Sequence, residues 1–271
     1  MAQSHKVALV TGASTGIGRA CAERLARRGW RVLAGVRSAG DAPSGTDEVI
    51  LDVTDEREIA AAAERVHELH GLVNNAGVAV ASPLEVIPLD ELRRQLEVNV
   101  LGQVAVTQAL LPALRRARGR IVFMGSIAGR SALPFLAPYA ASKHALEAIA
   151  DSLRVELAPW SVHVSIVEPG TIATPIWTKG AETAEGIQAK VPAETLALYR
   201  DRAAAFRRAA AAAGRRGESP ERVAEVVEHA LTARGPKTRY VVGRDAKIRA
   251  AFERLPDRLR DRVYERVLLH S

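Results

Sequence analysis

Residues 6–18 read Lys6-Val7-Ala8-Leu9-Val10-Thr11-Gly12-Ala13-Ser14-Thr15-Gly16-Ile17-Gly18. The apolar run that opens this stretch is typical of a buried strand, and residues 19–28 continue with apolar side chains at helical spacing. A strand, a glycine-rich turn and a helix N-terminus together predict a dinucleotide-binding unit. Gly12 would permit the tight turn, Gly16 the close approach of backbone to a pyrophosphate, and Gly18 close helix packing. The glycine spacing is G-x-x-x-G-x-G, not the commoner G-x-G-x-x-G.

Strand and helix patterns alternate along the rest of the chain, which predicts a parallel sheet covered on both faces. The apolar runs predict strands at 6–11, 31–36, 48–51, 71–74, 119–125, 162–167 and 239–242. Helical spacing predicts helices near 17–29, 55–68, 89–116, 140–158, 220–233 and 246–268. No internal repeat or linker interrupts the pattern, so we expect a single α/β domain over residues 1–271.

A second cluster of residues predicts catalytic chemistry. Tyr139 and Lys143 are four residues apart, so on a helix they share a face, and Ser126 lies thirteen residues before Tyr139. An adjacent ammonium favours the phenolate, which would lower the pKa of Tyr139 from its ordinary value near ~10. A phenol tuned in this way can exchange a proton with an alcohol or carbonyl oxygen. Ser126 could hold that oxygen by a hydrogen bond.

Together these motifs resemble the short-chain dehydrogenase/reductase family. The turn at 11–18 matches its T-G-x-x-x-G-I-G pattern, and residues 74–77 match its N-N-A-G element. The resemblance implies a doubly wound Rossmann-type sheet of seven parallel strands and hydride transfer at a nicotinamide. It also implies a catalytic set of Asn99, Ser126, Tyr139 and Lys143, in which Asn99 would position a water that continues a proton relay.

Cofactor contacts follow from the same resemblance. It implies that the cofactor is held by Gly12, Ser14, Thr15, Gly16, Ile17, Gly18, Arg37, Asp52, Val53, Asn75, Ala76, Gly77, Asn99, Tyr139, Lys143, Pro169, Gly170, Ile172 and Thr174. NAD enzymes of this kind usually carry an acidic residue where this chain has Gly35, whereas Arg37 could pair with a 2′-phosphate. We therefore expect NADP(H) to be favoured, with NAD(H) possible. Asp52 could instead cap the helix that starts near Glu56.

The substrate is expected to be a hydrophobic alcohol or ketone. The side chains that flank the expected cleft are apolar or aromatic: Leu133, Phe135, Leu136, Ile176 and Trp177. The chain resembles the 17β-hydroxysteroid and retinol dehydrogenase branch in its short approach to Asn74 and in its tail, a helical extension over about 245–271. The family places a substrate lid at about 172–218, which here carries Arg200, Arg202, Arg207, Arg208, Arg215 and Arg216.

Two alternative functions remain open. One is reduction of a 3-oxoacyl thioester, because an arginine-rich lid could attract an acidic carrier protein or coenzyme A phosphates. The other, from a different class, is a non-catalytic NADP-binding sensor or scaffold. We disfavour the sensor because Asn99, Ser126, Tyr139 and Lys143 are all present.

Composition limits the partners and the compartment. The formal net charge is +7, but the basic residues are spread along the chain beside acidic ones, so no nucleic-acid partner is expected. Cys21 is the only cysteine, which excludes an internal disulfide and fits a reducing cytoplasm. We expect no metal site and no membrane span. The family's habit of pairing two long helices, here 89–116 and 140–158, predicts a homodimer or homotetramer.

Overall fold

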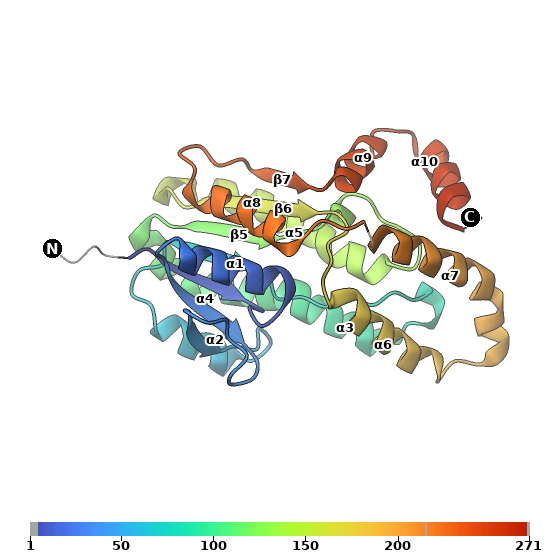
Figure 1. Cartoon of the computed structure of the whole chain (residues 1–271), viewed down its shortest axis with the longest axis horizontal. Coiled ribbons are helices and arrows are strands. Elements are labelled where there is room, and N and C mark those ends of the chain that lie inside the picture. Colours follow the sequence, from blue (N-terminus) through green and yellow to red (C-terminus); the bar gives the residue numbers. More distant parts are fainter. Residues whose placement is uncertain (1–4, 215, 270–271) are drawn as a thin grey trace.

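The fold, seen in a computed structural model that describes residues 5–214 and 216–269, is built on a seven-stranded parallel sheet. The strand order is β3-β2-β1-β4-β5-β6-β7, and Figure 1 labels β5, β6 and β7, which follow one another in this order. The strands are β1 (Val7–Thr11), β2 (Arg31–Val36), β3 (Asp47–Ile50), β4 (Gly71–Asn74), β5 (Arg120–Met124), β6 (His163–Pro169) and β7 (Arg239–Val242). The strand order reverses between β1 and β4, which is where a doubly wound sheet opens a crevice for a ligand. The expected fold class is confirmed.

Helices cover both faces of the sheet, and each face has its own apolar core. Alternate residues of a strand point to opposite faces, so Val10 packs with the helices α1 (Gly16–Arg27) and α8 (Pro220–Thr232). Leu9 packs on the other face with α2 (Glu56–Glu64), α4 (Gly102–Ala117) and α5 (Ala137–Glu156). Both strand residues are fully buried. The near-continuous apolar runs of the sequence therefore reflect strands that are buried on two sides.

Local sequence explains where two of the helices begin. Ser219 is the N-cap of α8, where its Oγ accepts a hydrogen bond from the Arg222 backbone N–H at 3.3 Å, and Pro220 takes the first helical position. Asp55 caps α2 through the backbone N–H groups of Arg57 and Glu58. The alternative role that the sequence left open for Asp52, a cap of this helix, is therefore filled by Asp55.

The helix expected over 89–116 has a π-helical turn within it. The helix α3 (Leu89–Leu96) continues through the π-helical segment η2 (Glu97–Leu101) into α4. Single π-helical turns widen a helix locally and are common at functional sites. Asn99 lies in this turn and is fully buried.

The helix expected over 246–268 is broken. It consists of α9 (Arg244–Phe252), α10 (Asp257–Tyr264) and a π-helical turn, η5 (Glu265–Leu269). Pro256 is the N-cap of α10 with φ −56° and ψ 140°, so it ends the helical path because proline lacks the N–H that the helix needs. The apolar spacing continues across this proline, which is why the sequence suggested one helix.

The expected lid segment, 172–218, contains two helices that the sequence pattern did not predict. They are α6 (Ile176–Gln188) and α7 (Ala193–Gly214), and Arg215 lies outside the described residues. Figure 1 shows α6, α7 and α10 at the end of the molecule far from the N-terminus. Across the described part of the chain, no helix combines the length and the apolar character that crossing a bilayer requires.

Candidate active site

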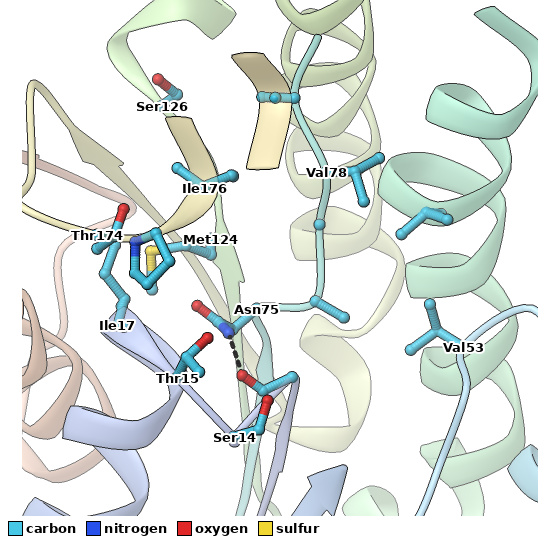
Figure 2. A pocket seen from close by; sticks show the side chains of 18 of the residues that line it. Ser14, Thr15, Ile17, Val53, Asn75, Val78, Met124, Ser126, Thr174 and Ile176 are labelled. Carbon is cyan, nitrogen blue, oxygen red and sulfur yellow. Dashed lines mark hydrogen bonds between the residues drawn. The ribbon is translucent and has the colours of Figure 1, made fainter. Parts of the chain in front are cut away.

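A cavity of about 570 Å³ opens at the carboxyl ends of the strands, on the side where β1 and β4 diverge. Several separate parts of the chain form its wall, as Figure 2 shows. The labelled side chains come from the glycine-rich turn and α1, from the segment after β3, from the ends of β4 and β5, and from the segment after β6: Ser14, Thr15, Ile17, Val53, Asn75, Val78, Met124, Ser126, Thr174 and Ile176. This is the location that Rossmann-type sheets offer to a ligand.

The glycine-rich turn is shaped by close backbone approaches. Gly12 has φ +63°, and a Cβ there would lie 3.0 Å from Ala76 Cα. A Cβ at Gly18 would lie 2.2 Å from the Gly12 carbonyl oxygen, so only glycine fits against the turn. Thr15, the N-cap of α1, makes no capping hydrogen bond with its side chain. The first N–H groups of α1 are therefore left without a side-chain cap at the cavity, where an anion could accept from them.

Asn75 ties the turn to the end of β4. Its Nδ2 donates to the carbonyl oxygens of Thr11 at 3.0 Å and Gly12 at 3.2 Å. In return, Thr11 Oγ1 accepts from the backbone N–H groups of Asn75 at 2.9 Å and Ala76 at 3.0 Å. These bonds fix the two diverging strands at the point where the crevice opens.

The far end of the cavity carries the residues expected to select the cofactor. Gly35, near the end of β2, lies beside Leu51, because a Cβ at Gly35 would meet Leu51 Cδ2 at 3.1 Å. Arg37 follows the strand, lines the cavity and is exposed. Asp52 also lines the cavity, and its Oδ1 accepts from the backbone N–H of Thr54 at 2.9 Å. The end of β2 therefore presents the Arg37 guanidinium to the cavity, and Gly35 stands where an acidic side chain would otherwise lie.

Ser126, Tyr139 and Lys143 meet at the opposite end of the cavity. Tyr139 and Lys143 lie one turn apart on α5, and Ser126 follows β5. Ser126 Oγ donates to the Pro169 carbonyl at 3.4 Å and accepts from the Ala128 N–H at 3.1 Å, and Ser126 lies near enough to Tyr139 to lower the pKa of the phenol. Lys143 Nζ donates to the Met124 carbonyl oxygen at 2.7 Å and lies 5.7 Å from the centroid of the Tyr139 ring.

The pKa of Tyr139 is shifted in the direction opposite to the one expected from its neighbour Lys143. Burial raises the pKa of the Tyr139 phenol above its ordinary value of 10.0, while Ser126 and the charge of Arg249 act the other way. Lys143 is itself buried, which lowers its pKa from 10.5 to about 8. Burial therefore dominates the pKa of the Tyr139 phenol, which is neutral at neutral pH.

Asn99 lies beneath the cavity and not on its wall. Its side-chain Oδ1 accepts from the Val78 N–H at 2.8 Å, and Nδ2 donates to the Val78 carbonyl at 2.9 Å and to Ser142 Oγ at 3.0 Å. Val78 and Val98, on either side of this contact, line the cavity. Because Asn99 lies in the π-helical turn, these bonds also hold that turn against the segment after β4.

Only some of the residues expected for the substrate pocket line the cavity. Ile176 and Trp177 line the cavity, and the Trp177 ring packs edge-on against Tyr139 with 5.7 Å between centroids. Leu133, Phe135 and Leu136 do not line it. Phe135 turns instead toward Phe206 of α7, with ring centroids 5.4 Å apart, and has an unusual φ of +65°. Sequence position near the catalytic helix does not predict that turn.

Several lining residues were not anticipated from the sequence: Gly35, Val36, Leu51, Thr54, Val78, Ala79, Arg94, Glu97, Val98, Met124, Gly125, Pro175, Gly180 and Thr183. Val78 and Ala79 directly follow the Asn74–Gly77 element in the sequence, so their position next to this motif could have predicted that they line the cavity. Gly180 and Thr183 come from α6, a helix that the sequence pattern did not predict. Within residues 5–214 and 216–269, no group of three or more His, Cys, Asp or Glu side chains is placed to hold a metal ion.

A doubly wound sheet whose cavity joins a glycine-rich turn to a serine, a tyrosine and a lysine defines a class of dinucleotide-dependent oxidoreductases. The family model described as short chain dehydrogenase matches residues 6–185. The chain therefore belongs to the short-chain dehydrogenase family. It is an oxidoreductase, and action on the CH–OH group of an alcohol is consistent with this family.

Known relatives agree with this assignment. The chain is 36% identical to the NADPH-dependent 3-dehydrocapnine reductase of Ornithobacterium rhinotracheale, with 96% of each chain covered. It is 40% identical to retinol dehydrogenase 5 of Mus musculus, over 88% of this chain and 81% of the relative. A solved short chain dehydrogenase from Burkholderia cenocepacia in complex with NADP has a TM-score of 0.76 at 29% identity, covering 97% of this chain and 98% of the other. These relatives match the expectations of a retinol dehydrogenase-like branch and of NADP(H) as favoured cofactor.

Proposed function

We propose that the protein is an NADP(H)-dependent oxidoreductase that interconverts a secondary alcohol and a ketone, or a primary alcohol and an aldehyde, on a hydrophobic substrate. NADPH, when bound, supplies the hydride that reaches the carbonyl carbon. Tyr139 gives its phenolic proton to the carbonyl oxygen, and in the oxidative direction it takes that proton back. The observation that carries the proposal is that Ser126, Tyr139 and Lys143 line the same cavity as the glycine-rich turn.

The residues around the cavity fit a dinucleotide phosphate. The turn brings backbone close to the cavity at Gly12 and Gly16, both with positive φ, and α1 begins there without a side-chain cap. Arg37 would pair with the 2′-phosphate, and the position of Gly35 lacks the acidic group that binds free ribose hydroxyls. The relative named as NADPH-dependent and the neighbour solved with NADP support this preference. NAD(H) remains a weaker alternative cofactor.

Each side chain near the reacting oxygen has a distinct role in the proposal. Ser126 holds the substrate oxygen next to the phenol, because Ser126 and Tyr139 line the same end of the cavity. The raised pKa keeps the Tyr139 phenol protonated at neutral pH, which suits proton donation during reduction. Lys143 places a positive charge one helical turn below, where it stabilises the tyrosinate left after proton transfer. Thr174 would hold the carboxamide end of the cofactor.

The test follows NADPH and NADH consumption against hydrophobic ketones, including a steroid, retinal and a 3-oxoacyl thioester. Replacing Tyr139 with phenylalanine should reduce turnover by about 10²- to 10⁴-fold, the usual contribution of a general acid, while NADPH binding by fluorescence is kept. Tyr199→Phe, which removes a phenol on α7 that bonds Glu85, is the matched control and should leave turnover unchanged.

Unchanged turnover in Tyr139→Phe would refute the role given to the phenol. Turnover of the thioester alone would transfer the proposal to acyl-thioester reduction. NADPH binding without turnover of any carbonyl compound would favour a sensor.

A further inference from the structure

Glu168 is a fully buried carboxylate that the proposed reaction does not use. It lies in β6 directly before Pro169, which ends this strand and lines the cavity. Removing a carboxylate from water is costly unless cations and hydrogen bonds compensate for the lost hydration. The partners of Glu168 therefore show which parts of the chain this carboxylate holds together.

Two guanidinium groups compensate the Glu168 carboxylate. Its Oε2 accepts from Arg130 Nη1 at 3.3 Å, and its Oε1 lies 3.5 Å from Arg239 Nε. Arg239 is shared, because it also donates to Glu147 at 3.0 Å and to Asp151 at 2.7 Å, both on α5. Arg130 pairs with no second carboxylate in the part of the chain that the structure describes. The ion pair with Arg130 is therefore the contact that belongs to Glu168 alone.

Arg130 directly follows the short turn that carries Ser126. Ser126 is the N-cap of the 3₁₀ turn η3 (Ile127–Gly129), and its Oγ accepts from the Ala128 N–H at 3.1 Å. The Arg130 N–H donates to the Ile127 carbonyl at 3.1 Å and so closes this turn. Because only the residues of η3 separate Arg130 from Ser126, a shift of Arg130 is passed on to Ser126.

Glu168 also adjoins Ser126 from the opposite side, through Pro169. Ser126 Oγ donates to the Pro169 carbonyl oxygen at 3.4 Å, which is longer than an ordinary O–H···O hydrogen bond. Such a weak bond leaves the hydroxyl hydrogen able to turn toward a substrate oxygen in the cavity. Ser126 thus lies between two groups whose places depend on Glu168, the ion-paired Arg130 and the next residue, Pro169.

We infer that Glu168 is a positioning residue for Ser126: paired with Arg130, it holds the η3 turn so that the Ser126 hydroxyl can turn from Pro169 to the substrate oxygen. This inference rests on the proposed function for the part that Ser126 takes in the reaction. A polarising group must be set in advance where charge develops, and a misplacement of about 1 Å can cost about 100-fold in rate. Loss of the ion pair should therefore slow the chemical step more than it weakens NADPH binding.

The turnover arm is a double-mutant cycle between Ser126 and Arg130, run with NADPH and the carbonyl compound of the panel that is reduced fastest. Ser126→Ala should lower kcat by about 10²-fold, the usual effect of losing a donor at the reacting oxygen. Arg130→Met should lower kcat by about tenfold, with the Kd of NADPH within about twofold of wild type. In the Ser126→Ala background, Arg130→Met should lower kcat by less than about twofold, because the group that it positions is already gone. Equal factors in the two backgrounds, or an unchanged kcat in Arg130→Met, would overturn the inference.

Glu168→Gln tests the other member of the pair, because it keeps the shape of the side chain and removes the charge. It should lower kcat by about the same factor as Arg130→Met, and the two changes together should lower kcat no further, since either one breaks the ion pair. Arg130→Lys keeps a positive charge and should keep most of the wild-type rate.

Arg24→Met is the matched control for loss of a half-buried arginine. Arg24 of α1 is ion-paired with Glu228 of α8, and neither residue lines the cavity. The control should leave kcat unchanged. A loss of kcat in Arg24→Met as large as in Arg130→Met would assign the effect to general destabilisation and overturn the inference.

The unfolding arm needs no turnover, and it decides the inference if no carbonyl compound is reduced. Ser126→Ala removes two hydrogen bonds of the native protein and should raise the equilibrium constant for unfolding in urea about tenfold. In an Arg130→Met background this factor should fall below about threefold, because the turn is already loosened. Glu168→Gln serves as the background if Arg130→Met does not fold.

Equal unfolding factors in the two backgrounds would refute the positioning role of Glu168. Unequal factors, without turnover of any carbonyl compound, would uphold the positioning role and refute the proposed function.

Discussion

Asn99 binds both backbone groups of Val78 through its side-chain amide, with Oδ1 accepting at 2.8 Å and Nδ2 donating at 2.9 Å. The pair joins the π-helical turn η2 to the segment that leaves β4. Val78 lines the cavity, whereas Asn99 is fully buried behind it. The side chain of Asn99 therefore holds the cavity wall in place, in addition to any part that the residue takes in a proton relay.

Asn99→Ala should lower the free energy of unfolding by about 2–3 kcal/mol, because it leaves the Val78 N–H without its acceptor and leaves the Val78 carbonyl with Gln95 as its remaining side-chain donor. Urea unfolding followed by circular dichroism measures the difference. Ser142→Ala removes only one of the partners of the Asn99 amide and should cost about 1 kcal/mol. A smaller loss in Asn99→Ala than in Ser142→Ala would contradict the holding role.

Arg37 is expected to decide between the two dinucleotides. Arg37→Ala should lower kcat/KM for NADPH by about 10- to 100-fold, the value of a lost charged hydrogen bond, and leave NADH nearly unaffected. Arg31 is the matched control, since it lies at the opposite end of β2 and pairs with Asp47 at 2.8 Å. Arg31→Ala should change neither value, and an equal loss for both dinucleotides in Arg37→Ala would contradict phosphate recognition.

The pH dependence of reduction should follow Lys143. Burial lowers the pKa of Lys143 to about 8, so its ammonium is present below that pH and is lost above it. The Tyr139 phenol, with a raised pKa, stays protonated through this range. We expect kcat/KM for ketone reduction to be level below pH ~8 and to fall up to tenfold per unit above it.

Lys143→Arg tests this assignment, because a guanidinium stays charged throughout the range. The variant should be slower but should lose the decline that begins near pH 8. A decline that remains at the same pH in Lys143→Arg would assign it to another group.

The strands, and the meeting of Ser126, Tyr139 and Lys143 at one cavity, were predictable from sequence because each depends on local pattern. Buried parallel strands are continuous apolar runs, and Tyr139 and Lys143 share a helix face by spacing alone. The break at Pro256 and the helix α7 were missed, since apolar spacing crossed the proline and an alanine-rich run gave no clear face. The contact of Arg249 with Ser131 joins residues far apart in sequence. Only the packed chain reveals such a relationship.

The outer faces of α4 and α5 are expected to pair with a second copy of the chain. They border a hollow of about 330 Å³ with a mostly apolar lining that includes Leu111, Ile149 and Leu153. Ala148 is exposed in this hollow, so Ala148→Arg should place a charge in the interface without disturbing the core. Light scattering should show a dimer or tetramer for the wild type and a monomer for this variant. Ala210→Arg, on the exposed part of α7, should leave the assembly unchanged, and a wild-type monomer at micromolar concentration would contradict the pairing.

Glu147, one helical turn beyond Lys143, should make stability depend on pH. Burial and the neighbouring Glu168, which is fully buried, raise the pKa of Glu147 from 4.5 to about 7, and Arg239 and Arg130 oppose them only in part. The folded protein therefore holds a proton that the unfolded chain has already released, so stability falls as pH rises from about 4.5 to about 7. The free energy of unfolding should fall by about 2 kcal/mol over this range, because solvent partly screens the carboxyl group and reduces the full effect of the pKa shift.

Glu147→Gln removes this titration while it keeps an oxygen that can accept from Arg239 Nε, a bond of 3.0 Å in the native protein. Urea unfolding at a series of pH values should show that the titration of residue 147 no longer lowers the stability of the variant. The difference in unfolding free energy between variant and wild type should therefore change by about 2 kcal/mol between about pH 4.5 and about pH 7. Glu64→Gln, at the exposed end of α2, is the control and should follow the wild type. Parallel curves for wild type and Glu147→Gln would mean that the buried carboxyl does not keep its proton at neutral pH.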